Sequence, residues 1–232
     1  MRIIDAVWEK RNLGVTCYEV LFESNDELKE IKSMWHQFEE RQYLVFKIPP
    51  NRIDIVNYLQ EKNCRFIEIS MSFQADLKNW TLPEKLKPVC EQCTWAKMND
   101  DDLEFMFEEI GKNIFKTDRV YLDPYFTHKQ AAQRYINWSH DALKKGEIGW
   151  KVMYQNEIVG FSLGALGGVY SQFEGTGMGL MIQYAQIQRD IADGLKICRG
   201  DYSSNNIEML NILYALNKKL KDMKYVFIKH NN

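Results

Sequence analysis

Three glycines alternate with other residues in the segment Gln172-Phe-Glu-Gly-Thr-Gly-Met-Gly-Leu-Met181. Glycine has no Cβ atom, so Gly175, Gly177 and Gly179 leave the backbone open to close approach by an anion. An apolar helical segment follows directly, and the first turn of a helix offers unpaired N–H groups and the positive end of the helix dipole. This combination predicts a loop that binds the diphosphate of a nucleotide-like cofactor, and therefore an enzyme.

Two other phosphate-binding motifs do not fit this loop. The dinucleotide fingerprint needs Gly-x-Gly-x-x-Gly after a first strand and an acidic residue about 20 positions later. The glycines here alternate, and they lie near the C-terminal end of the sequence. A Walker loop would need Gly-Lys-Ser or Gly-Lys-Thr, which the segment lacks.

The bulk composition is that of an ordinary globular protein. The chain has 232 residues, of which 45% are hydrophobic and 27% charged, with a net charge of −2. This near-neutral balance gives no general affinity for nucleic acid or an anionic membrane. No apolar run approaches the roughly 18 residues of a membrane span, and the N-terminus lacks a signal-peptide core. We expect a cytoplasmic protein with neither nucleic acid nor a membrane as its partner.

The five cysteines are scattered, which fits a reducing compartment better than a disulfide framework. Only Cys90 and Cys93 stand at a spacing typical of metal ligands, and a structural zinc site needs about four ligands. No second Cys-x-x-Cys pair exists, and the four histidines are dispersed. We therefore expect no metal site, and two thiols at the start of a strand instead.

Hydrophobic periodicity divides the chain into a smaller N-terminal αβ unit over residues 1–80, a linker over 81–92 and a larger unit over 93–232. The linker is rich in proline and charge. In the first unit, residues 24–26 are predicted to cap the first helix. The predicted strands cover residues 18–22, 43–48 and 65–73, and the predicted helices cover 25–40 and 52–62.

The second unit is predicted to contain a hairpin, a glycine loop and several helices. A helix–turn–strand order with an Arg/Lys–aromatic pattern occurs in both units, which suggests a distant internal repeat. The strands are predicted at 93–97, 150–154, 158–163, 166–170, 195–199 and 225–229, and the helices at 99–110, 127–145, from the glycine loop to 192, and from a cap at 203–206 to 219.

The second unit resembles the GNAT superfamily of acyl-CoA-dependent N-acetyltransferases over residues 93–230. Gln172-x-x-Gly175-x-Gly177 matches the CoA diphosphate motif of that family. The block Ser203-Ser-Asn-Asn206-Ile-Glu-Met-Leu-Asn211 and the terminal strand 225–230 follow in the family's order. The resemblance implies a mixed α/β (α+β) fold with a central twisted mixed sheet flanked by helices. It also implies acetyl-CoA as co-substrate, entering between two splayed strands at 166–170 and 195–199.

Within that superfamily the chain is most similar to the dTDP-fucosamine acetyltransferases. The likeness is carried by the segments 8–14, 46–49, 59–68 and 119–138. It implies an acceptor that is a small amine, such as an amino sugar linked to a nucleotide.

The resemblance also implies a set of cofactor-binding residues. Loop N–H groups would hold the diphosphate, and the preceding strand would pair with the pantetheine arm as an added strand. Two asparagines of the later block would reach CoA, although helix capping and a solvated face explain them equally well. The set is Gly168, Val169, Tyr170, Gln172, Gly175, Thr176, Gly177, Met178, Gly179, Asn206 and Asn211.

Transfer to an amine needs a neutral amine and a proton for the leaving thiolate. Many family members place a tyrosine where this chain has Leu213, and Tyr214 lies one residue later, turned by about 100° around the helix. Tyr214 is a candidate acid only if the helix is shifted; its alternative role is packing. Water or the attacking amine is the alternative donor of this proton.

Glu68 is the candidate base that removes the proton from the amine. Its alternative is an ordinary solvent-facing position on a strand.

Tyr121, Asp123 and Tyr125 belong to a loop that lines the acceptor pocket in this fold, although Asp123-Pro124 is also a plain helix-start signal. Little room exists for two strands between residues 158 and 175, so we expect short strands or a tight turn at Gly164-Ala165. The acceptor pocket is then abbreviated or is completed by a second chain, as in a homodimer.

Two other functions remain open at this stage. The first is a CoA-binding or sensor module that kept the loop and lost the acid, which Leu213 favours. The second is a transferase of another acyl group, or one that acts on a protein. The near-neutral charge gives no support to a protein acceptor.

Overall fold

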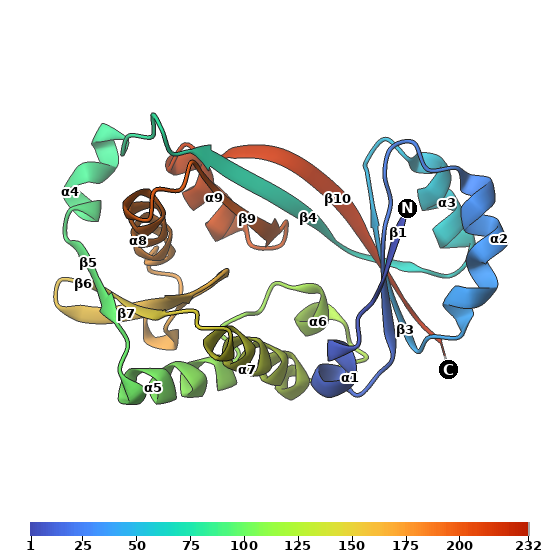
Figure 1. The fold of residues 1–232 in the computed structure, drawn as a ribbon, viewed down its shortest axis with the longest axis horizontal. Coiled ribbons are helices and arrows are strands. Elements are labelled where there is room, and N and C mark those ends of the chain that lie inside the picture. Colours follow the sequence, from blue (N-terminus) through green and yellow to red (C-terminus); the bar gives the residue numbers. More distant parts are fainter. Residues whose placement is uncertain (232) are drawn as a thin grey trace.

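The computed structural model describes residues 1–231, and its strands form two sheets (Figure 1). The larger sheet has the order β1-β2-β3-β10-β4-β9, and the smaller has the order β5-β6-β7-β8. The strands are β1 (Arg2–Asp5), β2 (Cys17–Leu21), β3 (Tyr43–Ile48), β4 (Arg65–Asp76), β5 (Cys93–Lys97), β6 (Gly149–Tyr154), β7 (Glu157–Leu163), β8 (Leu166–Val169), β9 (Ile197–Ser203) and β10 (Lys219–His230).

The helices cover both sheets. Figure 1 shows α2 and α3 on one side of the larger sheet and α8 between the two sheets, while α5 and α7 lie below the smaller sheet. The helices are α1 (Trp8–Leu13), α2 (Leu28–Glu39), α3 (Ile53–Glu61), α4 (Lys87–Cys90), α5 (Asp100–Gly111), α6 (Arg119–Leu122), α7 (His128–Lys144), α8 (Gly179–Ala192) and α9 (Ile207–Ala215), with 3-10 turns η1 (Glu84–Leu86) and η2 (Ser171–Phe173).

Most of the predicted elements are confirmed, including the mixed α/β class. Asn99 and Thr127 each form a capping box at the start of a helix. Gln155 and Asn156, both at positive φ, close the β6–β7 hairpin, which fits the right-handed twist of its strands. A tight turn at Gly164, with φ of 54°, joins β7 to the four-residue strand β8, as expected from the limited room.

Two predicted helix limits are wrong. Residues 24–26 do not cap α2, because Glu27 holds the cap position and the Asp26 carboxylate accepts from the Glu23 N–H and the Met1 amine. The last helix ends at Ala215 rather than near residue 219, because Asn217 takes the left-handed conformation with φ of 60° and turns the chain into β10.

The expected internal repeat is present as a strand–helix–strand–helix–strand order. The first copy runs β2-α2-β3-α3-β4 and the second runs β8-α8-β9-α9-β10. Helix α3 begins at residue 53 and α9 at 207, while β4 begins at 65 and β10 at 219, so one offset of 154 residues relates both pairs. Both helices end alike: Asn63 and Asn217 are left-handed, with φ of 59° and 60°.

The two repeats exchange their final strands. Strand β10 pairs with β3 of the first repeat, β4 pairs with β9 of the second, and β4 and β10 pair antiparallel with each other. The larger sheet therefore runs across the region where composition suggests a domain boundary. Leu82 and Leu86, in the segment predicted as a linker, pack against buried core residues.

The repeats differ in one respect that bears on function. In the first repeat β2 and β3 pair in parallel from Cys17 opposite Tyr43 to Leu21 opposite Lys47. In the second repeat the corresponding strands β8 and β9 lie in different sheets and do not pair over the described residues. The second repeat is therefore open where the first is closed.

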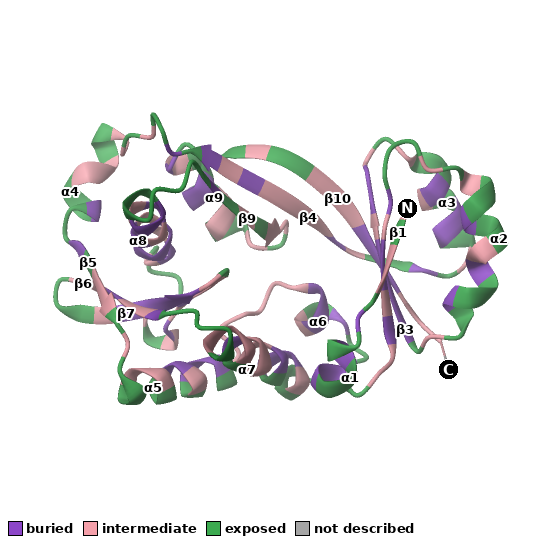
Figure 2. Ribbon diagram, viewed as in Figure 1, coloured by how far each residue is buried: buried purple, intermediate pink, exposed green. Residues whose placement is uncertain are grey.

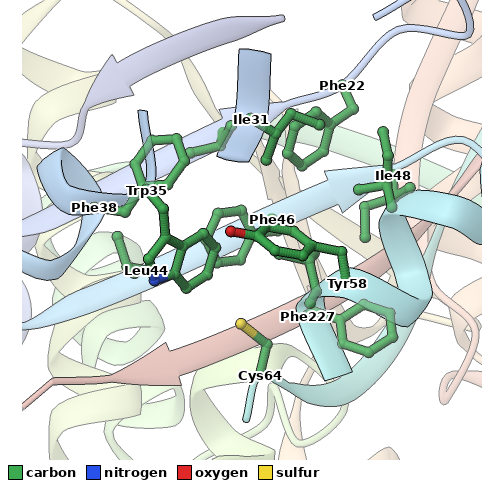
Figure 3. Packing of buried hydrophobic residues seen from close by; sticks show 13 residues of the cluster. Phe22, Ile31, Trp35, Phe38, Leu44, Phe46, Ile48, Tyr58, Cys64 and Phe227 are labelled. Atoms are coloured by element: carbon green, nitrogen blue, oxygen red, sulfur yellow. The ribbon is translucent and has the colours of Figure 1, made fainter. Parts of the chain in front are cut away.

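An aromatic core holds the first repeat in place. Figure 3 shows Trp35, Phe38, Phe46 and Tyr58 gathered between α2, β3 and α3. The ring centroids of Trp35 and Phe38 lie 5.8 Å apart at 88°, an edge-to-face contact. In Figure 2 the faces of α2 and α3 toward the sheet are buried, and their outer faces are exposed. This packing fixes β3, and with it the register of β10.

Because of the strand exchange, neither half should fold by itself. A fragment of residues 93–232 lacks β4, which leaves β9 and β10 without their shared partner. We expect this fragment to show no cooperative thermal unfolding by circular dichroism. Co-expression with residues 1–92 should restore a transition like that of the full chain. Cooperative unfolding of the isolated fragment would contradict the exchange.

Candidate active site

A cavity of about 200 Å³ opens between β8 and α9, where the second repeat is unpaired. Its wall comes from four parts of the chain: the segment between α5 and α6, strand β8, the glycine loop with the start of α8, and the start of α9. The lining residues are Ile114, Phe115, Lys116, Thr117, Gly167, Gly168, Val169, Ser171, Phe173, Glu174, Gly175, Gly179, Ile182, Asn206, Glu208, Met209 and Ile212.

Strand β8 presents a free backbone edge to this cavity. The Tyr170 N–H donates to the Val159 carbonyl of β7 at 3.0 Å, and Gly168 stands opposite Phe161. Hydrogen bonds alternate along an antiparallel pair, so Gly168 also points its polar groups toward β7. The residues whose N–H and C=O face the open edge are Gly167 and Val169. Of the predicted residues Gly168, Val169 and Tyr170, only Val169 therefore has backbone groups free for a ligand. Gly167 also has free backbone groups, and the sequence analysis did not predict it.

Neither the side chain nor the backbone of Tyr170 is available to a ligand. Its side chain is buried, and its carbonyl accepts from the Phe173 N–H at 2.8 Å. Gly168 is a glycine for packing reasons, because a Cβ atom there would lie 2.7 Å from the Phe161 ring and 2.8 Å from Ile114 Cδ1.

The three glycines of the loop serve different purposes. Gly175 and Gly177 have φ of 74° and 80°, in the left-handed region that favours glycine, and the space next to each is open. Gly179 is the first residue of α8, where a Cβ atom would lie 3.0 Å from Ile212 Cδ1. The first two glycines shape the turn, and the third lets α8 pack closely on α9.

The turn ends at an uncapped helix N-terminus. Met178 holds the cap position of the 14-residue helix α8, and no side chain of the described residues caps it. Gln172, Thr176 and Gly177 are exposed at the mouth of the cavity without lining it. The loop therefore offers backbone N–H groups and the positive end of the α8 dipole to the solvent at the cavity mouth.

Glu109 of α5 anchors the start of the glycine loop. Its buried carboxylate accepts the Ser171 N–H at 2.6 Å and a hydrogen bond from Lys112 at 2.5 Å. Burial raises the pKa of Glu109, but these hydrogen bonds outweigh it and leave the pKa below its usual value.

The two predicted asparagines have different positions. Asn206 lines the cavity and also caps α9, since its side chain accepts from the Met209 N–H at 3.1 Å. The capping role of Asn206 is therefore confirmed, and its contact with CoA stays a prediction. Asn211 is exposed and does not line the cavity.

Helix α9 places no tyrosine in the cavity. Met209 and Ile212 face it, while Leu213 is fully buried. Tyr214 is 54% exposed and packs edge-on against Phe73 of β4, with 5.2 Å between the ring centroids. Two residues correspond to about 200° around a helix, so Tyr214 points away from the side that Ile212 occupies.

The sequence analysis did not single out Lys218, which directly follows the left-handed Asn217. Its side chain is buried, and its Nζ donates to Gln183 Oε1 at 2.9 Å and to Cys198 Sγ at 3.2 Å.

Glu68 lies on β4 with its side chain almost fully buried, at 8% exposure. One carboxylate oxygen, Oε2, has no hydrogen-bond partner among residues 1–231. Burial raises the pKa of Glu68, and the nearby Ser203 hydroxyl and Arg119 guanidinium only partly offset it. Glu68 does not line the cavity, but two residues near it connect it to the cavity wall. Asp118 directly follows the lining residue Thr117, and Ser203 lies three residues before the lining residue Asn206.

Of the predicted acceptor loop, only Asp123 and Tyr125 lie between α6 and α7, whereas Tyr121 belongs to α6 itself. None of the three residues lines the cavity. Asp123 is fully buried: its Oδ2 pairs with His230 Nε2 at 2.6 Å and its Oδ1 accepts the Tyr125 N–H. Its carboxylate is therefore occupied, and Thr127 rather than Asp123 begins α7. Tyr125 stacks on His230 and Tyr121 on His128, with centroids 3.9 Å and 4.2 Å apart.

A buried ion network holds α6 beside the cavity. Arg134 of α7 donates to both Glu9 oxygens at 2.8–3.1 Å, and Arg119 of α6 donates to Glu19 at 2.5 Å. Burial raises the pKa of Glu19, but Arg119, Lys47 and Arg134 together outweigh it and lower the pKa to about 2. Glu9, Arg119 and Arg134 belong to segments that carry the family likeness. Which of these charged residues pair with one another could not be predicted from the sequence.

Two kinds of feature are absent from residues 1–231. No group of three or more His, Cys, Asp or Glu side chains is arranged to hold a metal ion there, and Cys90 and Cys93 are buried free thiols. No helix in the same range is long and apolar enough to cross a membrane.

Comparison with known proteins identifies the fold. No family model and no curated protein sequence matches the chain. A GCN5-related N-acetyltransferase from Sphaerobacter thermophilus matches it with a TM-score of 0.62 and 12% identity, over 93% of this chain and 73% of the other. The chain has the GNAT fold. A tandem GNAT protein of the clavulanic acid pathway matches with a TM-score of 0.56 and 10% identity, over 93% of this chain and 75% of the other.

A third GNAT match is part of a larger protein. It is the glucosamine N-acetyltransferase region of a fungal multi-domain β-N-acetylglucosaminidase, with a TM-score of 0.64 and 9% identity, over 98% of this chain and 31% of the other. The two strands that the sequence resemblance predicts to be splayed correspond to β8 and β9, which lie in different sheets.

The anchoring role of Glu109 can be tested by stability. Glu109→Ala leaves the part-buried Ser171 N–H without its acceptor, so we expect the free energy of unfolding to fall by about 1–3 kcal/mol in urea titrations. The control is Glu108→Ala, an exposed neighbour on the same helix, expected to change it by less than about 0.5 kcal/mol. Equal effects from the two variants would show that Glu109 does not anchor the loop.

Proposed function

We propose that the protein is an acetyl-CoA-dependent N-acetyltransferase that acts on a small amine. The observation that carries the proposal is the opening between β8 and β9, which ends at a left-handed glycine turn and an uncapped helix N-terminus. The opening supplies a free strand edge for an extended arm, and the turn supplies N–H groups for an anion.

The cofactor would then lie along the cavity wall. Its diphosphate would contact the N–H groups of Gly175, Gly177, Met178 and Gly179. The predicted Thr176 would not contribute its N–H, which donates to the Phe173 carbonyl at 3.2 Å. Its pantetheine arm would pair with the N–H and C=O groups of Gly167 and Val169 as an added strand. Asn206 lines the same cavity and would face the arm from α9.

Glu68 is the base that this proposal assigns. A buried carboxylate with one unpartnered oxygen and a raised pKa accepts a proton more readily than an exposed glutamate. The deprotonated amine nitrogen would attack the thioester carbon, and the C–S bond would break as the amide forms. The exposed position of Tyr214 argues against it as the acid. The leaving thiolate would take its proton from water or from the attacking amine.

The acceptor that we propose is an amino sugar. The sequence resemblance suggests a nucleotide-linked amino sugar, and one neighbour of similar fold is named as a glucosamine N-acetyltransferase region. Amino sugars, free and nucleotide-linked, are therefore the first amines to test.

A CoA-binding module without catalysis is the second candidate, and the absence of a tyrosine of α9 from the cavity favours it. A thermal-shift titration with acetyl-CoA, followed by an assay for free thiol with an amine panel, separates the two. Stabilisation with thiol release supports the transferase, and stabilisation without release from any amine supports the module. No stabilisation by any CoA ester would overturn both.

The glycine turn gives the first test of cofactor binding. Gly177→Ala forces a Cβ onto a left-handed residue, which costs of order 1 kcal/mol and shifts the turn N–H groups. We expect the Kd for acetyl-CoA to rise about tenfold by calorimetry. Gly194→Ala is the matched control, because its φ is 75°, its surroundings are also open and it lies beyond the far end of α8. An equal loss of affinity in both variants would show that strain alone is responsible.

The role of Glu68 predicts a pH dependence. A base acts only when ionised, so kcat/KM should fall as the pH drops through the raised pKa of Glu68. Glu68→Gln should lower kcat by about 10²-fold to 10⁴-fold and abolish this limb of the pH profile. Tyr214→Phe is the comparison and should keep both the rate and the profile. An unchanged profile in Glu68→Gln would exclude Glu68 as the base.

A further inference from the structure

An ion pair crosses the mouth of the cavity. Lys116, from the segment between α5 and α6, places its Nζ 2.7 Å from each carboxylate oxygen of Glu174 in the glycine loop. Both residues line the cavity, and their side chains are 41% and 58% exposed. The pair thus joins two walls that are far apart in sequence, directly beside Gly175.

The charges around the cavity are unfavourable for an anion without this lysine. Among the lining residues, all within 1–231, Glu174 and Glu208 carry negative charge and Lys116 is the one cation. A diphosphate bound at the N–H groups of Gly175 and Gly177 would lie next to the Glu174 side chain. The negative charges of the diphosphate and Glu174 would repel each other, so diphosphate binding at this loop needs a nearby cation.

The backbone around Lys116 is held at both ends while its side chain is free to move. Upstream, Ile114 packs onto Gly168, where a Cβ atom would come within 2.8 Å of Ile114 Cδ1. Downstream, Asp118 caps α6 through the Val120 and Tyr121 N–H groups. An exposed ion pair contributes little to stability, so moving the Lys116 ammonium costs little.

We propose that Lys116 is a phosphate-binding residue that Glu174 holds in place before the cofactor arrives. This inference rests on the proposed function. When the cofactor binds, the Lys116 ammonium exchanges its Glu174 partner for a diphosphate oxygen of CoA. Glu174 thereby keeps the cation at the mouth of the empty cavity, and it opposes the anion whenever Lys116 is absent.

The test compares ligands with and without the diphosphate. The probes are CoA, titrated by calorimetry, and pantetheine, titrated by NMR. We expect Lys116→Met to weaken CoA binding about tenfold and to make the salt dependence of its affinity shallower, while leaving pantetheine binding unchanged. Glu174→Gln should strengthen CoA binding severalfold and leave pantetheine binding unchanged. Lys129→Met, an exposed lysine at the start of α7, controls for the net charge and should behave as the wild type.

The outcomes separate this inference from the function on which it rests. Wild-type affinity for CoA in Lys116→Met would overturn the assignment of Lys116, while the cofactor site would stand. An equal loss for CoA and pantetheine would also overturn it, because the lysine would then support the cavity wall and not the phosphate. A wild-type protein that binds neither probe would instead overturn the proposed function.

Discussion

The antiparallel pairing of β4 with β10 is the interaction on which the rest of the structure depends. Each of these strands is the last element of its own repeat in the sequence, but it pairs with a strand of the other repeat: β4 with β9, and β10 with β3. The same pairing sets Val226 opposite Glu68. Two residues further along β4, Ser70 stands opposite Ser203 of β9 on the other side of the strand. The carboxylate proposed as the base thus comes from the first repeat, while the cavity wall at Asn206 comes from the second. Neither repeat contains the whole site.

The two repeats also differ in the residues that they bury at two matching positions. With the offset of 154 residues, Leu44 and Cys64 of the first repeat correspond to Cys198 and Lys218 of the second. All four are buried. The first repeat fills these positions with an apolar pair next to its closed strands, whereas the second buries an ammonium against a thiol and an amide. The core of the second repeat is therefore more polar at these positions than the core of the first.

The charged residues near the cavity divide into a fixed set and a movable set. Glu9, Arg134 and Arg119 are buried and hydrogen-bonded, and removing one partner would leave an uncompensated charge in the interior. They hold α6 and α7 in position. Lys116 and Glu174, by contrast, pair at the surface, where water screens them. The protein therefore combines a rigid frame behind the cavity with an exchangeable ion pair at its mouth.

The sequence by itself determined those features that depend on residues close together in the chain. The glycine turn, the Asn99 and Thr127 caps, the hairpin at Gln155-Asn156 and the tight turn at Gly164 are local, because φ preferences and capping act within a few positions. The order of the motifs was sufficient to indicate the GNAT fold.

Only the tertiary structure decided which distant groups meet. It placed β4 between β9 and β10, buried Asp123 against His230, turned Tyr214 toward the solvent, and made Gly167 rather than Gly168 face the open edge. These outcomes depend on strand register and helix rotation. A shift of one residue in a strand reverses which groups face a site, and local spacing carries no information about the partner across the sheet.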